Sequence, residues 1–261
     1  MARVHSKRRD DAPAGFFEAE AAGLAWLAAA RGVRVVEVRS VAPGRLDLEA
    51  LDLARPTGAH AEAFGAVLAI THDAGAAGWG APPDGWDGPT FIGNQALSTR
   101  SGGWPRWGAF YAEQRVLPYA RRAAQRGHIG GRDLEAVERA CGRLTSGDLD
   151  DDDAPSRLHG DLWNGNVQWT GEGAVVIDPA AHGGHRETDL AMLALFGCPH
   201  LARVYAGYDG ARALRPGWEE RIPLHQLHPL AVHAASHGPS YAAPLVAAAR
   251  SVLDLPAAAA G

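Results

Sequence analysis

The sequence predicts an α+β fold, in which a small N-terminal antiparallel sheet is followed by a larger and mainly helical part. Residues 33–38 and 45–51 alternate apolar with polar side chains, a pattern typical of half-buried strands. Most later segments space their apolar residues at the intervals of an amphipathic helix. Because the pattern changes after residue 51, we predict an N-terminal domain over 1–51 and a C-terminal domain over 52–261.

The composition is that of a soluble globular protein with one or two domains. Of the 261 residues, 46% are hydrophobic and 21% are charged. The net charge of −5 gives no basic surface for nucleic acid or an anionic membrane, and no apolar run could span a bilayer. The N-terminus lacks the apolar segment of a secretion signal, and two cysteines make no disulfide framework. We therefore expect a cytoplasmic protein with buried, reduced cysteines.

The N-terminal part is expected to contain three strands and one helix. Residues 3–7 predict a short strand that ends at Lys7, the only lysine of the chain. Taken alone, this lysine is expected at the surface, where most lysines lie. Residues 16–27 predict a helix with Phe17 and Leu24 on one face. The strands at 33–38 and 45–51 would complete the sheet.

The rest of the chain is predicted to be helical apart from three loops and one strand. Helices are expected over 58–73, 104–126, 133–144 and about 187–196, and again after residue 200. Residues 74–104 are rich in Gly, Pro and Trp and predict a long loop. The acidic run 148–153 predicts a solvated loop, because it lacks the spaced ligands and the glycine of a calcium loop.

Four histidines near the C-terminus raise the question of a metal site: His225, His228, His233 and His237. His233 and His237 are one helical turn apart, which suits a shared metal ion. However, no cysteine or acidic residue completes the set, and Pro229 interrupts it. The sequence therefore favours core or interface histidines over metal ligands.

The chemistry of the chain is concentrated in the loop at 158–166 and in the strand that follows it. Asp161 and Asn166 are five residues apart, and Asp178 ends the apolar run 174–177. In kinases, one Asp accepts the proton of the attacking hydroxyl, while an Asn and a second Asp hold magnesium on the nucleotide phosphates. An Asx turn alone could explain Asp161 and Asn166. The complete pattern of loop, strand and second Asp favours phosphoryl transfer.

Three segments resemble a known family: HGDLWNGN at 159–166, IDPA at 177–180 and GHRETDLAM at 184–192. They are similar to the fructosamine kinase (ketosamine-3-kinase) family, part of a broader group of aminoglycoside-phosphotransferase-like and protein-kinase-like enzymes. Trp163 in the loop and the third segment distinguish this family from the other members. The resemblance extends from about residue 7 to about residue 253. It implies a two-lobe, protein-kinase-like fold.

The resemblance also implies an ATP site with Mg²⁺. Lys7 would contact the α and β phosphates and pair with Glu20, for which Glu18 is the less favoured alternative. The chain would cross between the lobes at Glu49, Ala50 and Leu51, whose backbone groups would face the adenine.

In the same resemblance, Asp161 is the catalytic base, and Asn166 and Asp178 are the magnesium ligands. Further residues are implied in substrate binding or in support of the loop: His159, Trp163, His185, Arg186, Glu187 and Asp189. Two interpretations of Trp163 stay open, because its ring could stack on the substrate or pack the loop. Asp189 could support the catalytic loop or simply suit a helix N-terminus.

Residues 74–104 also allow two interpretations. The resemblance places this loop over the acceptor site. Alternatively, Trp79, Trp86 and Phe91 could only pack it onto the larger lobe. Pro179 and the short segment after it differ from a protein-kinase activation loop, which argues against a switch by loop phosphorylation.

The function that the resemblance implies is ATP-dependent phosphorylation of a sugar hydroxyl of ketoamines, such as fructosamine and ribulosamine adducts, in protein or metabolite deglycation. The acceptors would be small-molecule ketoamines or glycated protein side chains, with no nucleic acid or membrane partner, and we expect a monomer. An alternative is a small-molecule alcohol kinase of the aminoglycoside, choline or homoserine type.

The N-terminus departs from the family pattern. The family has two further strands and a glycine-containing phosphate loop before the lysine strand, whereas residues 1–6 alone precede Lys7. We therefore expect a truncated N-terminal lobe with an exposed sheet edge and weak nucleotide binding. A non-catalytic, kinase-like remnant is a further alternative.

Overall fold

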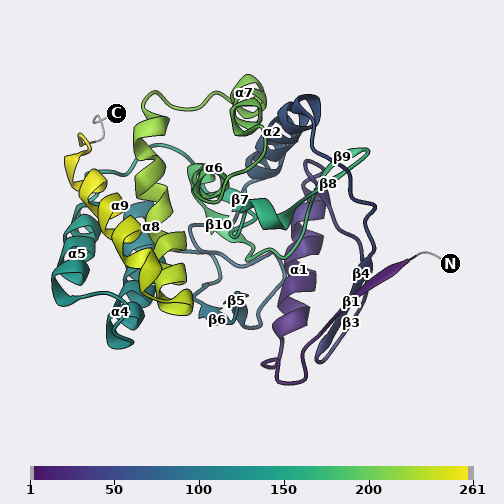
Figure 1. The fold of residues 1–261 in the computed structure, drawn as a ribbon, viewed down its shortest axis with the longest axis horizontal. Coiled ribbons are helices and arrows are strands. Elements are labelled where there is room, and N and C mark those ends of the chain that lie inside the picture. The colour runs from purple at the N-terminus through teal and green to yellow at the C-terminus, as the bar shows by residue number, and fades with distance from the viewer. Residues whose placement is uncertain (1–2, 258–261) are drawn as a thin grey trace. The chain divides into compact units, whose positions relative to one another are not determined.

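The computed structural model describes residues 3–257 of the chain (Figure 1). The chain forms two compact units, each built from two separate stretches. The first combines Met1–Gly103 with Pro155–Arg215, and the second combines Trp104–Ala154 with Pro216–Gly261. The domain boundary after residue 51 stays a prediction.

The first unit begins with a three-stranded antiparallel sheet in the order β1-β4-β3. Its strands are β1 (Val4–Arg8), β3 (Val38–Ala42) and β4 (Arg45–Glu49). Helix α1 (Phe16–Ala29) lies alongside this sheet (Figure 1). Leu46 and Leu48 of β4 are buried in one cluster with Phe17 and Leu24 of α1. Burial of each leucine contributes roughly 2 kcal/mol, so this cluster fixes α1 on the sheet.

A second sheet corrects one prediction. Residues 33–38 do not form a single strand of the N-terminal sheet. Strand β2 (Arg34–Val35) instead pairs in parallel with β9 (Gly173–Val176), which pairs with β8 (Val167–Thr170). The backbone N–H of Val36 donates to the carbonyl of Val176 at 3.1 Å, and its side chain is buried. Because residue 36 is held by β9, the chain reaches the N-terminal sheet only at β3.

The long loop at 74–104 contains an unpredicted hairpin. Strands β5 (Thr90–Ile92) and β6 (Gln95–Leu97) pair around a turn at Gly93, which has φ +52°. A residue without a Cβ adopts such a φ at low cost. A further pair, β7 (Ser156–Leu158) and β10 (His182–Gly184), flanks the predicted catalytic loop.

The helices of the first unit are α2 (Gly58–Asp73), α6 (Arg186–Leu195) and α7 (Leu201–Ala211). Helices α2 and α7 cross closely, because each has a glycine at the contact. A Cβ on Gly65 would lie 1.9 Å from the carbonyl oxygen of Val204, and one on Gly207 would lie 1.9 Å from that of Glu62. This close packing places Tyr208 of α7 beside His72 of α2.

The second unit is helical. It contains α3 (Trp107–Phe110), the π-helix η1 (Tyr111–Val116), α4 (Leu117–Gln125), α5 (Gly131–Ser146), α8 (Trp218–His237), the 3₁₀ turn η3 (Pro239–Tyr241) and α9 (Ala242–Asp254). The predicted helix over 104–126 is therefore divided and begins at Trp107.

Helix α8 continues through Pro229 because another group replaces the missing N–H of the proline. The hydroxyl of Tyr111 donates to the carbonyl of His225 at 2.7 Å, the carbonyl that an N–H at residue 229 would have bonded. His225 and His228 are buried, as the core interpretation expects. Cys141 and Cys198 are buried and form no disulfide, as predicted. Within residues 3–257, no helix combines the length and apolarity needed to cross a bilayer.

Candidate active site

The loop that follows β7 is held by Asp189 of α6. One carboxylate oxygen of Asp189 accepts the backbone N–H of His159 at 2.8 Å, and the other accepts that of Gly160 at 3.0 Å. Gly160 has φ +81°, and a Cβ there would lie 2.2 Å from the carbonyl oxygen of Ala180. Asp189 therefore supports the loop from inside. An acidic residue that only suited the N-terminus of α6 would not need these two hydrogen bonds.

Two buried residues behind Asp189 were not identified from the sequence. The Nε2 atom of His72 lies 3.2 Å from Asp189, and its Nδ1 atom lies 2.8 Å from the hydroxyl of Tyr208. All three side chains are at most 1% exposed. Burial tends to raise the pKa of Asp189, but the hydrogen bond from His72 and the backbone donors hold it below its usual value. Asp189 is therefore an anion that orients two loop amides.

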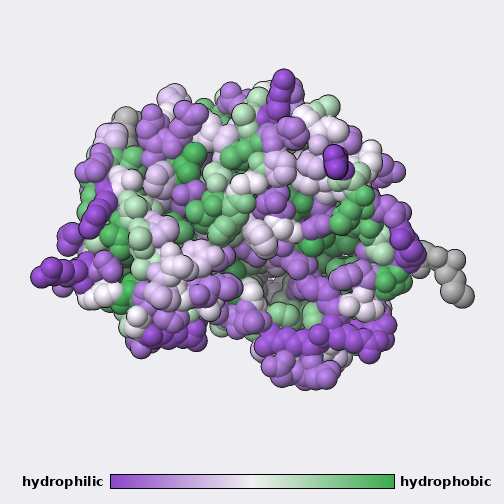
Figure 2. Space-filling view, in the orientation of Figure 1, coloured by the Kyte–Doolittle hydropathy of each residue, from purple (hydrophilic) through white to green (hydrophobic). Residues whose placement is uncertain are grey.

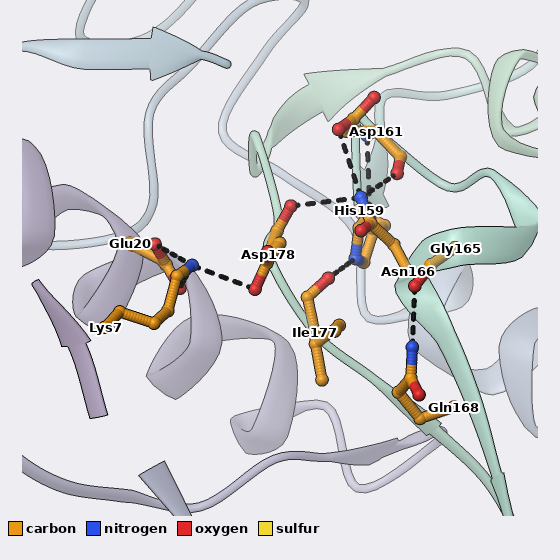
Figure 3. Close-up of polar contacts among 9 residues, drawn as sticks. All are labelled: Lys7, Glu20, His159, Asp161, Gly165, Asn166, Gln168, Ile177 and Asp178. Atoms are coloured by element: carbon orange, nitrogen blue, oxygen red, sulfur yellow. Dashed lines mark hydrogen bonds and ion pairs between the residues drawn. The ribbon is translucent and has the colours of Figure 1, made fainter. Parts of the chain in front are cut away.

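His159 connects the loop to the end of β9. Its Nε2–H donates to the carbonyl of Ile177 at 2.8 Å, and its Nδ1 accepts the backbone N–H of Asp161 at 3.2 Å (Figure 3). Burial lowers the pKa of His159, so the neutral ring has one donor and one acceptor, as these two bonds require. The predicted supporting role of His159 corresponds to this bridge.

Asp161 and Asn166 contact each other directly. The side-chain amide of Asn166 donates to the carbonyl and to the carboxylate of Asp161, at 2.8 and 3.0 Å (Figure 3). Burial raises the pKa of Asp161 to about 7, and the charges of Asp178 and Asp189 act in the same direction against the hydrogen bond from Asn166. A carboxyl group with a pKa near neutrality is suited to accept a proton.

Lys7 lies between two carboxylates that come from different elements. Its Nζ is 2.7 and 2.8 Å from the two oxygens of Glu20, in α1, and 3.0 Å from Oδ1 of Asp178 (Figure 3). Burial opposes the charged ammonium, but Glu20 and Asp178 outweigh it and raise the pKa of Lys7. The pairing of Lys7 with Glu20 is thus present, and Lys7 is not a surface lysine, with 24% of its side chain exposed.

Asp178 adopts a backbone conformation that is uncommon for a residue other than glycine, with φ +54°. Such conformations cost roughly 1–3 kcal/mol and concentrate at functional sites. Here the turn after β9 directs the Asp178 carboxylate toward Lys7 and its carbonyl toward the amide of Asn166.

The oxygen atoms at this point fit a hard divalent cation such as Mg²⁺. Asn166 uses its amide nitrogen for its three hydrogen bonds, so its Oδ1 accepts none from residues 3–257. Oδ2 of Asp178 likewise has no partner in the described part of the chain. One amide oxygen and one carboxylate oxygen, completed by waters and phosphates, match what magnesium takes from proteins.

Two cavities of the first unit meet at Lys7 and Asp178, the two residues that line both. The larger cavity, of about 490 Å³, contains Asp161, Asn166 and Trp163 in its lining. The smaller, of about 310 Å³, has the apolar side chains of Val36, Leu48, Leu51, Leu53 and Ile177 in its wall. The site therefore consists of a larger space that contains Asp161 and a smaller slot with these apolar side chains in its wall, and the two share one lysine and one carboxylate.

The three predicted adenine-facing residues line the smaller cavity, but their groups differ in availability. The Glu49 carboxylate accepts the backbone N–H of Glu37 at 3.0 Å, and the N–H of Ala50 donates to the carbonyl of Arg3 at 3.1 Å. The backbone N–H of Leu51 has no partner among residues 3–257. Of the three, Leu51 offers a free donor to the slot.

The block at 185–187 packs beside the site. His185, Arg186 and Glu187 are buried and are absent from the described linings of both cavities. His185 caps α6 by accepting the N–H of Glu187 and stacks on Trp79, while Arg186 donates to the carbonyl of Ala213 at 3.0 Å. These contacts fix the start of α6, three residues before Asp189. A direct role of this block toward substrate stays a prediction.

Trp163 lies on the wall of the larger cavity and is 38% exposed. Its ring covers Gly165, because a Cβ on Gly165 would lie 2.2 Å from it, and it contacts Phe196 edge-on at 5.9 Å. The ring therefore packs on the loop, and it also borders the larger cavity. Both interpretations of Trp163 are compatible with this position.

The β5–β6 hairpin contributes Phe91, Gly93 and Asn94 to the larger cavity. Phe91 also packs on Phe16 of α1, with ring centroids 5.1 Å apart. The sequence did not identify Phe16 or Arg9 as cavity residues. Strand alternation does not identify Arg9, because β1 ends at Arg8 and Lys7, Arg8 and Arg9 all line the same cavity.

Comparisons with known proteins agree with this geometry. A family model described as fructosamine kinase matches residues 2–254. A protein of Klebsiella aerogenes named "Probable ketoamine kinase" is 35% identical over 229 residues, which are 85% of this chain and 75% of that protein. A crystal structure from Thermobifida fusca, described as "putative fructosamine-3-kinase", has a TM-score of 0.87 and 47% identity over 97% of this chain and 86% of that one.

A more distant structure extends the likeness in fold alone. A choline/ethanolamine kinase family protein from Mesorhizobium loti has a TM-score of 0.57 and 15% identity, over 97% of this chain and 83% of that one. The predicted protein-kinase-like fold is thereby confirmed. Because the family model covers nearly the whole chain and the two nearer proteins agree with it, this chain belongs to the fructosamine kinase family, a family of phosphotransferases.

Proposed function

We propose that this protein transfers the γ-phosphoryl group of ATP to a sugar hydroxyl of a ketoamine, a fructosamine or ribulosamine adduct. The observation that supports it most strongly is the meeting of two cavities at Lys7 and Asp178. The apolar side chains of the smaller slot suit a nucleobase, and the larger space contains Asp161, which suits an acceptor hydroxyl. Lys7 then lies where the phosphates of the nucleotide would pass from one to the other.

In the nucleotide slot, the free N–H of Leu51 would donate to the adenine ring. Val36, Leu48 and Ile177 would pack on the faces of the ring. Lys7, held by Glu20, would position the phosphates through charge-assisted hydrogen bonds. Mg²⁺, when bound by Asn166 and Asp178, would neutralise phosphate charge.

In the acceptor space, Asp161 accepts the proton of the sugar hydroxyl. The hydroxyl oxygen forms its bond to the γ-phosphorus while the bond between that phosphorus and the bridging oxygen breaks, and the electron pair leaves with ADP. Asn166 holds the Asp161 carboxylate in place through the bond of 3.0 Å. Such a reaction depends mainly on positioning and charge stabilisation, which the fixed loop supplies.

The ketoamine class is supported by the relatives, whose names describe ketoamine and fructosamine kinases. Removal of glycation adducts from metabolites or proteins would be the corresponding role. A monomeric state and a cytoplasmic location stay predictions.

The test is release of ADP from Mg-ATP with a panel of acceptors: a fructosyl-amine, a ribulosyl-amine, kanamycin, choline and homoserine. We expect turnover on the ketoamines and none on the other three. The Asp161→Asn variant is the control for a contaminating kinase, and phosphorus NMR of the product identifies the modified hydroxyl. Turnover confined to kanamycin, choline or homoserine would contradict the ketoamine proposal. ATP binding without any turnover would favour a non-catalytic role.

A further inference from the structure

We propose that the larger cavity binds a carboxylate of the acceptor through the guanidinium of Arg9. The inference rests on the proposed function and deepens it, since it selects ketoamines formed on free amino acids over adducts without a nearby carboxylate. It arises from the uneven distribution of charge in the cavity and from the way in which Arg9 is fixed there.

The acidic side chains of the cavity are bound to partners within it, whereas two basic side chains lie at one end of it. Glu20 and Asp178 are both bound to Lys7, and Asp161 receives the amide of Asn166. The lining also contains Arg8 and Arg9 at the end of β1, with no further acidic residue among the described residues of the lining. The part of the cavity near the end of β1 is therefore cationic, which favours an anionic group on a ligand.

Three contacts fix the Arg9 guanidinium. Its Nη1 donates to Oδ1 of Asn94, in the β5–β6 turn, at 2.8 Å, and its Nε donates to Asp11 at 3.0 Å. Its Cζ lies 5.1 Å from the centre of the Phe16 ring, which itself packs on Phe91. A guanidinium stacked and bonded in this way is already oriented, so a ligand would lose little side-chain entropy in binding it.

The guanidinium still has capacity for a ligand. Its Nη2 donates to no residue in the described range 3–257. Its carboxylate partner Asp11 is 85% exposed, and ion pairs of that kind contribute little and exchange readily. A carboxylate that reaches Nη2 from the cavity would form a charge-assisted hydrogen bond, the stronger class of such bonds.

Arg8 adds to the same field. Its side chain is exposed and has no hydrogen bond or ion pair with the described residues, yet it lines the cavity beside Arg9. In Figure 2, the surface around the end of β1 and the β3–β4 turn is predominantly hydrophilic and borders a hollow beside the start of α1. A cationic acceptor such as an aminoglycoside would be repelled by these two arginines.

The chemistry of the acceptor fits this division of charge. In a ketoamine of an α-amino acid, the sugar lies on one side of the amine and the carboxylate lies two bonds away on the other. With a sugar hydroxyl at Asp161, the amine substituent extends into the remainder of the cavity, where Arg9 lies. An adduct on a lysine side chain within a protein has no carboxylate at that distance from the amine.

The experiment compares the ketoamines of glycine and glycinamide, which are similar in size and differ in the carboxylate. Turnover is measured as kcat/KM, and binding is measured independently by calorimetry without ATP. We expect the parent to prefer the glycine ketoamine by about tenfold or more. Arg9→Gln should lower kcat/KM and affinity for the glycine ketoamine much more than for the glycinamide ketoamine. Arg9→Lys should retain part of the preference.

Arg39→Gln is the matched control, because Arg39 lies on the same sheet, pairs with Glu37 and is absent from the lining of the cavity. This variant should leave kcat/KM and affinity for both ketoamines unchanged. Equal kcat/KM and affinity of the parent for the two ketoamines would overturn the inference. So would an Arg9→Gln variant whose kcat/KM falls equally for both ketoamines, or whose KM for ATP rises. If the glycine ketoamine binds through Arg9 but is not phosphorylated, the proposed function fails and the inference stands. If the glycine ketoamine is neither bound nor phosphorylated, both the inference and the proposed function fail.

Discussion

Lys7 Nζ lies 3.0 Å from Oδ1 of Asp178, and these two residues line both cavities of the site. They are 171 positions apart in the chain, so the contact exists only because β1 and the end of β9 are brought together. Glu20 completes the arrangement at 2.7 Å. The ammonium is thus held between helix α1 and the turn that follows β9.

This arrangement predicts unequal effects of two glutamates on one helix. Glu20→Gln should lower kcat/KM for ATP by about tenfold, because Lys7 loses a charged partner. Lys7→Met should lower kcat/KM for ATP by about a hundredfold, since the ammonium that would bind the phosphates is removed. Glu18→Gln is the matched control on α1 and should have no effect. Steady-state kinetics with varied ATP measure this, and an equal loss in the Glu18 and Glu20 variants would contradict the assignment.

The pKa of Asp161 predicts the pH dependence of turnover. Because burial raises this pKa to about 7, the carboxylate that accepts the proton is depleted as the pH falls below that value. We expect kcat/KM for the ketoamine to rise with an apparent pKa of about 7 and then to level off. In Asp161→Asn, kcat should fall by at least about a hundredfold. A profile with an apparent pKa near 4 would show that this carboxyl is not the titrating base.

The same raised pKa predicts that Asp161→Asn stabilises the fold. The unfolded chain releases the proton of Asp161 near the ordinary value of 3.8, whereas the folded chain keeps it up to about 7. The parent therefore loses stability as pH rises through this window, and the loss persists above it. Asn removes the buried charge, so its gain in melting temperature should be a few degrees at pH about 8 and smaller at pH about 5. A gain independent of pH would contradict the raised pKa.

Tyr208 lines neither cavity of the site, yet it is predicted to affect catalysis. Tyr208→Phe removes the hydroxyl that bonds Nδ1 of His72 and leaves that buried nitrogen without its donor, at a cost of about 1–3 kcal/mol of stability. Because His72 holds Asp189, and Asp189 holds the loop amides, kcat should fall several-fold while KM for ATP is retained. Tyr241→Phe, in η3, is the control. A stability loss with unchanged kcat would make the relay merely structural.

Gly165 is predicted to be required because of the Trp163 ring that covers it. Gly165→Ala would place a Cβ 2.2 Å from the present ring position, so the ring must move. We expect KM for the ketoamine to rise about fivefold if the Trp163 ring binds substrate. Gly171→Ala, in the β8–β9 turn with open space around it, is the matched control. An unchanged KM in Gly165→Ala would leave Trp163 with a packing role alone.

The local parts of the site could be predicted from the sequence. Asp161 and Asn166 are five residues apart in one loop, so their contact needs only the short turn between them. The apolar run 174–177 predicts the strand before Asp178. Glu20 was indicated by the resemblance to the family and not by the helix pattern, which Glu18 shares. The hairpin at 90–97 was missed, because three-residue strands are too short for an alternating pattern to be distinguished from a loop.

Long-range contacts could not be predicted in the same way. His72 is one of several polar residues in α2, and its partnership with Tyr208 depends on the close crossing of α2 and α7 at Gly65 and Gly207. The pairing of β2 with β9 could not be predicted either, because a two-residue strand is too short for its sequence to indicate a partner strand. Arg9 became a cavity residue only through Asn94 and Phe16.

The sequence by itself determined the fold class, the pattern of the loop at 158–166 and the family, because these depend on periodicity and on residues that are close together in the chain. The tertiary structure alone decided that Asp178 also holds Lys7, that the pKa of Asp161 is raised and that the larger cavity is cationic near the end of β1. The physical reason is that burial and charge depend on distances between side chains, and residues far apart in sequence acquire those distances only when the chain is folded.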